Sequence, residues 1–163
     1  MVLDPNKLKT NIKNLLTEKA ETYEDAAQNW VDAYVDYAGD AKGFIYSPTI
    51  PDSAKIAMKD TLKTYFENVD AGTAALAALA MANALTLFWL TPPIVFSVVP
   101  PVAVNPLTPP ATSVLISALT AIFMVIGGTE DSKAQQISSA IDTFTKTVWV
   151  INTTPPGTTA MLI

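Results

Sequence analysis

The sequence of 163 residues contains no cysteine, no histidine and no arginine, so all ten of its positive charges are lysines. These absences exclude a disulfide, a thiolate nucleophile, an imidazole acid or base and the Cys/His ligand sets of typical zinc sites. Serine and threonine are plentiful, but no evident general base accompanies them. The sole Gly-Gly pair, Gly127-Gly128, follows a helical pattern instead of a strand, so it does not predict a phosphate-binding loop. We therefore expect a protein that is not an enzyme and that needs no cofactor.

The charge that is present is negative overall and concentrated in the first part of the chain. A net charge of −5 and a pI near 4.5 argue against nucleic-acid binding, which needs a basic surface. Adjacent acids such as Glu24-Asp25 and Glu130-Asp131 stand at predicted helix starts, where negative charge is favourable, so we do not expect a metal site there. Residues 1–70 hold eight lysines and twelve acids, whereas the 59 residues 71–129 hold no charge.

An uncharged stretch of this length needs a membrane, a deep core or a partner surface to cover it. Its two apolar segments, 73–90 and 111–126, are 18 and 16 residues long, which is below the roughly 20 residues of a spanning helix. Neither is flanked by the lysine clusters that orient membrane helices. The sequence therefore favours a protein environment, and a two-span, holin-like membrane protein is the alternative hypothesis.

Helical patterns cover most of the chain outside residues 91–110. Asp4-Pro5 predicts the start of an amphipathic helix that ends near Ala20, and Thr22 and Thr129 are expected to cap two further helices. Either Asp52 or Ser53 is expected to cap the third helix. The remaining helices are predicted over 73–90 and 113–126; the first of these is apolar all round, which is typical of the centre of a bundle. Gly72 leaves open whether the third and fourth helices are continuous.

Residues 91–110 contain seven of the twelve prolines, yet they are apolar, unlike a solvated linker. We interpret them as a rigid arm that packs on its own bundle or on an adjacent subunit. The β-branched and aromatic residues 147–151 predict an extended segment. Its pairing partner is either the edge of another chain or a local sheet with residues 43–50.

These patterns predict a mainly α, single-domain protein: a bundle of five or six helices with an apolar proline-rich arm and a short C-terminal β-segment. Residues 1–70 form charged amphipathic helices, 71–128 form neutral apolar helices with the arm at 91–110, and 129–163 form an amphipathic helix with an extended tail. Oligomerisation is expected through 91–110 and 147–163. The candidate interface residues are Phe88, Trp89, Ile94, Val95, Phe96, Val98, Val99, Val148, Trp149, Val150 and Ile151.

The layout resembles that of small virion structural proteins of tailed bacteriophages. The resemblance rests on the opening segment 3–9, the alanine-rich middle, the segment 138–147, the following Val148-Trp149-Val150 and the Pro155–Thr159 tail. It implies a neck, tail, baseplate or head-associated component. Its partners would be other copies of itself and other virion proteins, and it would be found in the virion and, during assembly, in the host cytoplasm. Neutral apolar surface suits permanent subunit interfaces. A soluble helical adaptor is a further alternative.

Overall fold

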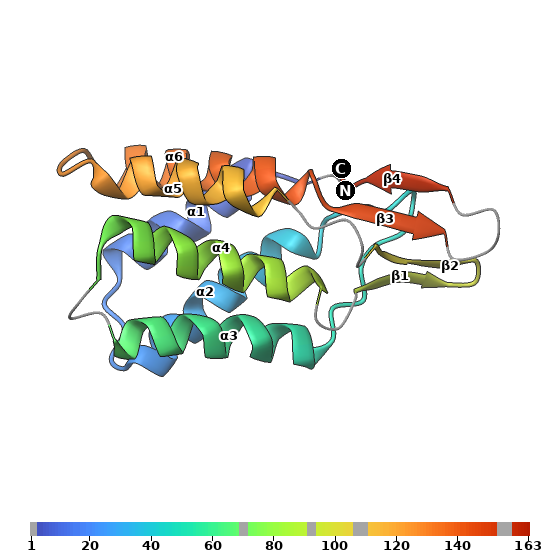
Figure 1. Ribbon diagram of the computed structural model, residues 1–163, viewed down its shortest axis with the longest axis horizontal. Helices are drawn as coiled ribbons and strands as arrows, with labels where there is room; N and C mark the ends of the chain where they lie inside the picture. Colours follow the sequence, from blue (N-terminus) through green and yellow to red (C-terminus); the bar gives the residue numbers. More distant parts are fainter. Residues whose placement is uncertain (1–2, 69–71, 91–93, 106–110, 153–157) are drawn as a thin grey trace.

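The computed structural model describes residues 3–68, 72–90, 94–105, 111–152 and 158–163. Within them the chain is mainly α-helical, as the sequence predicts, and a small sheet lies at one end of the elongated bundle (Figure 1). The helices are α1 (Pro5–Thr17), α2 (Tyr23–Ala38), α3 (Asp52–Glu67), α4 (Ala74–Leu90), α5 (Thr112–Met124) and α6 (Glu130–Thr145). The strands are β1 (Val95–Val98), β2 (Pro101–Val104), β3 (Trp149–Asn152) and β4 (Thr159–Met161).

Most helix starts follow the capping residues that the sequence provides. The Asp4 carboxylate accepts from the Asn6 backbone N–H at 2.9 Å, and the hydroxyls of Thr22 and Thr129 accept from backbone N–H groups three residues further on. The predicted cap of the third helix is wrong. Pro51 occupies that position and has no side chain to accept a hydrogen bond, so Asp52 already belongs to the first turn.

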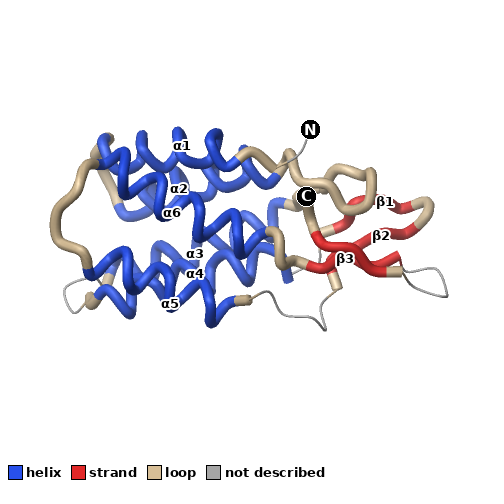
Figure 2. The backbone as a smooth tube through the Cα atoms, turned by 90° about the horizontal axis from the view of Figure 1, so that it is seen from above, coloured by secondary structure: helices blue, strands red, loops and turns tan. Residues whose placement is uncertain are grey.

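The helices form two groups seen from above in Figure 2, with α1, α2 and α6 on one side and α3, α4 and α5 on the other. Each helix packs against its neighbour in sequence, and α6 returns to contact α1. Helices α3 and α4 are two separate helices that pack on each other, so the chain turns back between Glu67 and Ala74. Short connections of this kind place consecutive helices side by side. None of the described helices is long and apolar enough to cross a membrane.

The sheet is antiparallel throughout, with the order β1-β2-β3-β4. The described part of the rigid arm predicted over 91–110 is the β1–β2 hairpin of residues 95–104, with Val98 paired to Pro101 at its turn, and it packs on its own bundle through Phe96. Residues 91–93 and 106–110 of the predicted arm lie outside the described residues. The C-terminal segment was predicted to pair with another chain or with residues 43–50. Both predictions are wrong, because β3 pairs with β2 and β4 of the same chain. The 43–50 segment contributes one bridge, in which the Thr49 N–H donates to the Val95 carbonyl.

An aromatic cluster joins the bundle to the sheet. The Trp89 ring at the end of α4 lies edge-on to Tyr34 and Phe88, and it stacks on Phe96 of β1 with 6.4 Å between ring centroids. Gly43 lies against this cluster, where an added Cβ would stand 2.8 Å from the Phe96 ring. The cluster therefore fixes the position of the β1–β2 hairpin on the end of the bundle.

Candidate functional site

The structure divides the predicted interface residues into a buried and an exposed group. Six of them are at most 5% exposed and lie in the core of their own chain, so they present no surface to another subunit. These are Phe88, Trp89, Ile94, Phe96, Val148 and Val150. Phe88 and Trp89 were candidates as an aromatic pair at a helix end, and the other four because the sequence offered no certain partner for the arm and the C-terminal strand. In the structure β2 and β3 pair with each other.

The exposed group lies mainly at the turn of the β1–β2 hairpin. Val98 and Val99 are 78% and 89% exposed, and we call this pair the hairpin tip. Val95 is 38% exposed, whereas Trp149 and Ile151 are partly buried in the sheet. In Figure 1 the hairpin extends away from the helices, at the end of the long axis. The hairpin tip is thus the part of the predicted interface that remains available to a partner.

Helix α4 presents a second apolar surface that sequence reasoning missed. Its apolar character on all sides predicted a central position, but one side of it faces solvent. Leu76, Leu79 and Leu87 are 46%, 41% and 37% exposed, and exposed Asn83 lies between them at helical spacing. We call these three leucines the leucine stripe. A helix without charges gives no signal that distinguishes its solvent side from its core side.

A third apolar surface lies where the chain passes from α5 to α6. The helix ends at Met124 rather than at the predicted Ile126, and Met124, Val125 and Ile126 are 68%, 56% and 101% exposed. We call these three residues the loop tip. Gly127 and Gly128 follow with φ of 105° and 90°, a conformation that glycine adopts without a steric penalty. This loop stands at the end of the bundle opposite the sheet (Figure 1). The glycine pair indicated the end of the helix in the sequence, but the residue types before it did not indicate whether they are exposed.

A buried polar network holds the helices that carry these surfaces. The Trp89 indole N–H donates to the Tyr34 hydroxyl at 2.7 Å, and that hydroxyl lies 2.8 Å from the Thr145 hydroxyl. One helix turn away, the Tyr37 hydroxyl donates to Asp142 at 2.6 Å, and Lys146 donates to the other carboxylate oxygen at 2.8 Å. Residues from α2, α4 and α6 are thereby connected in the core.

Burial raises the pKa of both tyrosine hydroxyls far above the ordinary value, and the Asp142 carboxylate beside Tyr37 raises the pKa of that hydroxyl further. Both tyrosines therefore stay protonated at neutral pH. A phenol that is held neutral and already donates to a carboxylate is unsuited to be a nucleophile or a base. The network is chemically a structural element.

Charged side chains gather on α1, α2, α3 and the start of α6, and many of them pair across helices. Lys7 of α1 contacts Asp36 and Asp40, and Asp131 of α6 lies within 3.1 Å of Lys9 and Lys13. These lysines lower the pKa of Asp36 and Asp131, with a hydrogen bond from Asn11 as the largest cause for Asp36. The solvent-exposed surface of the charged helices therefore carries positive and negative charges side by side.

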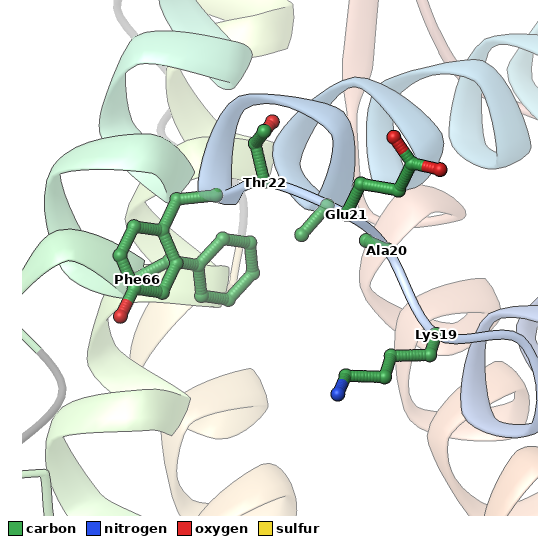
Figure 3. A pocket seen from close by; sticks show the side chains of 7 residues that line it. Lys19, Ala20, Glu21, Thr22 and Phe66 are labelled. Atoms are coloured by element: carbon green, nitrogen blue, oxygen red, sulfur yellow. The ribbon is translucent and has the colours of Figure 1, made fainter.

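A hollow of about 600 Å³ opens at the turn between α1 and α2 (Figure 3). Tyr23, Ala26 and Phe66 supply its apolar wall, and the Lys19 and Glu21 side chains extend in different directions. The Thr22 hydroxyl is occupied as the cap of α2. Among the described residues, no group of acids is placed to hold a metal ion.

Comparison with protein-family models, with curated proteins and with solved structures found no match to this chain. The surfaces and contacts described above are therefore the basis for inferring its function.

Proposed function

We propose that this protein is a structural subunit of a larger protein assembly, and specifically a component of a tailed-phage virion that binds other copies of itself through apolar surfaces. The observation that carries the proposal is the presence of three separate apolar surfaces on one uncharged part of the chain. The leucine stripe, the hairpin tip and the loop tip all lie between residues 76 and 126. Exposed apolar surface of this kind marks interaction sites in folded proteins.

The charge distribution favours neighbours of the same kind. An uncharged surface loses little when it is buried, because no ion has to leave water. The same surface on a second copy is equally uncharged, so two copies meet without unpaired charge. The charged helices α1, α2 and α3, in contrast, are suited to remain in solvent. The proposal of a virion component rests in addition on the resemblance of the sequence layout to small virion structural proteins of tailed bacteriophages.

The test is the mass of the purified protein in detergent-free solution, measured by size-exclusion chromatography with light scattering. We expect a discrete oligomer. Replacing the leucine stripe by serine (Leu76→Ser, Leu79→Ser and Leu87→Ser together) should weaken assembly and leave the helical circular dichroism signal unchanged. The matched control is Leu16→Ser, because Leu16 is 38% exposed but lies on charged α1. This control should assemble as the parent protein does.

A protein that stays monomeric at every concentration would contradict the proposal. Partition into the membrane fraction, with solubility only in detergent, would instead favour the two-span membrane protein. The virion assignment has its own test: an antibody against this chain should label purified virions from cells that produce it. Absence from the virions, with assembly intact, would remove that part alone.

A further inference from the structure

A small hollow between α5 and α6 is distinct from the three exposed surfaces. It has a volume of about 270 Å³. Its lining comes from the first half of α5 with the residue before it, and from the second half of α6 with Thr147. The lining residues are Ala111, Val114, Leu115, Ala118, Ala140, Thr143, Phe144 and Thr147. Three alanines stand where longer side chains would fill the space, so the hollow is a consequence of small residues on facing helices.

The chemistry of the lining restricts what can enter. The Thr143 hydroxyl donates to the Ser139 carbonyl at 2.8 Å, and the Thr147 hydroxyl donates to the Phe144 carbonyl at 2.6 Å. The Thr147 oxygen also accepts from the Ala111 N–H at 3.2 Å. With its hydroxyls engaged inside the chain and no charged residue in its lining, the hollow favours an apolar group. Roughly 150 Å³ of apolar cavity accommodates a benzene molecule, so this hollow has room for a branched aliphatic side chain.

The loop tip carries a side chain of that kind. Ile126 is fully exposed, and nothing lies within 4 Å of the Cβ positions of the two glycines that follow it. The space beside the loop tip is therefore not occupied by the chain itself. The loop tip does not line the hollow of its own chain, because the hollow extends along α5 only as far as Ala118, roughly 9 Å before the helix ends at Met124.

We propose that the loop tip of one copy inserts into the α5–α6 hollow of the next copy. This inference rests on the proposed assembly function and names the contact that builds the assembly. Neither surface contains a charge, so the contact buries no ion. Because the two surfaces differ and lie apart on one molecule, the contact is head-to-tail. Repetition of such a contact produces a closed ring or an open filament.

The hairpin tip is the competing occupant. Val98 and Val99 are also apolar and exposed, but they lie side by side on a strand turn, at the same end of the bundle as the hollow. The loop tip lies at the other end and presents a single leading side chain. Ile126 is 101% exposed, more than Val98 or Val99, so it is the favoured occupant.

The first experiment measures the concentration at which half of the protein is assembled. Ile126→Asp removes the inserting group, and Ala118→Leu fills the hollow from inside. Each should raise that concentration by at least about tenfold, the effect of losing one buried aliphatic side chain. Two controls should assemble as the parent does. Ile45→Asp adds the same charge at an isoleucine that is 80% exposed, and Ser117→Leu adds the same side chain to α5 outside the hollow.

The second experiment mixes the two variants at a concentration above that at which half of the parent protein is assembled and below that at which either variant assembles alone. Ile126→Asp retains an open hollow, and Ala118→Leu retains an intact loop tip. We expect each variant alone to be monomeric and the mixture to form a species of two chains that grows no further. This complementation requires folded partners, so it also excludes misfolding as the reason for lost assembly.

The outcomes separate this inference from the proposed function. Variants that assemble as the parent does would overturn the loop-tip contact and leave the assembly function intact. Loss of assembly with Val98→Asp but not with Ile126→Asp would overturn it in favour of the hairpin tip. A mixture that stays monomeric would overturn the head-to-tail arrangement. A monomeric parent protein would overturn both proposals.

Discussion

The charged helices α1, α2 and α3 and the uncharged segment 72–129 bury their apolar side chains under different conditions. In the charged helices every solvent-facing side is marked by lysines and acids, and many of these pair with a neighbouring helix, as Lys59 and Lys63 do with Glu24. In the uncharged segment apolar residues lie on both the buried side and the solvent-facing side of a helix. Trp89 is completely buried and Leu79 is 41% exposed on the same helix. Charged residues therefore indicate which side of a helix faces solvent. A helix without charged residues gives no indication of which side is buried.

The largest expected effect comes from the buried side of the uncharged segment. Trp89→Ala should lower the free energy of unfolding by about 3–5 kcal/mol, because it removes a large buried ring. It also removes the hydrogen bond to Tyr34 and the stack on Phe96. Urea denaturation followed by circular dichroism gives the value. Leu79→Ala on the exposed side should change it by no more than about 0.5 kcal/mol. Equal effects of the two would show that the two sides of α4 do not differ as described.

A smaller effect is expected from the buried polar network, which connects the charged α2 to α6. Asp142→Ala removes the carboxylate that accepts from the buried Tyr37 hydroxyl, and it should cost about 1–3 kcal/mol. Lys146→Met removes the other partner of Asp142 but should cost less than about 1 kcal/mol, because the Lys146 side chain is 44% exposed. The same denaturation experiment compares the two. A larger loss for Lys146→Met would mean that the ion pair, rather than the tyrosine contact, holds the two helices together.

The smallest effect is expected from acid, and it should be confined to the charged helices. Lysine contacts lower the pKa of Glu24 and Asp131, and Asn11 and Lys7 lower the pKa of Asp36. A lowered carboxyl pKa contributes stability that is complete above the ordinary value of about 4 and is lost as pH falls through the lowered value. At pH 3 the protection factors for hydrogen exchange, which correct the exchange rates for the intrinsic effect of pH, should therefore fall more in α1 than in α4 or α5.

The pH comparison has a matched control. Asp131→Asn removes the partner of Lys9 and Lys13 and should reduce the pH dependence of the hydrogen-exchange protection factors in α1. Leu87→Gln, on uncharged α4, should leave it unchanged. An equal acid response of α1 and α4 in the parent protein would contradict the division into a charged and an uncharged region.

Local chemistry explains why the helices could be predicted. Asp4, Thr22 and Thr129 cap helices because the hydrogen bond runs to a backbone N–H two or three residues away, so no distant residue takes part. The exposure of the loop tip was not predicted. It depends on where α5 leaves the body of the protein, and no residue near Ile126 records that.

The β1–β2 hairpin, which is the described part of the predicted arm, also depends on a distant part of the chain. The prolines of residues 91–110 indicated a rigid arm, and the apolar residues indicated that the arm is covered by its own bundle or by an adjacent subunit. The cover turned out to be β3, which lies about 50 residues further along the chain and pairs Val102 with Asn152. Antiparallel pairing between distant segments has no local signature, because either strand could pair with any free edge.

The sequence by itself determined the helical class, most helix starts, the absence of charge from 71 to 129 and the lack of Cys, His and Arg chemistry. These properties depend on residue types and on short-range spacing. Only the tertiary structure decided that Trp89 and Phe96 are core, that the leucine stripe and the loop tip are surface, and that Tyr34, Tyr37 and Asp142 meet. The physical reason is that burial is a property of the packed chain. An apolar residue without charged neighbours in sequence is compatible with the core and with the surface, and only the packing decides between them.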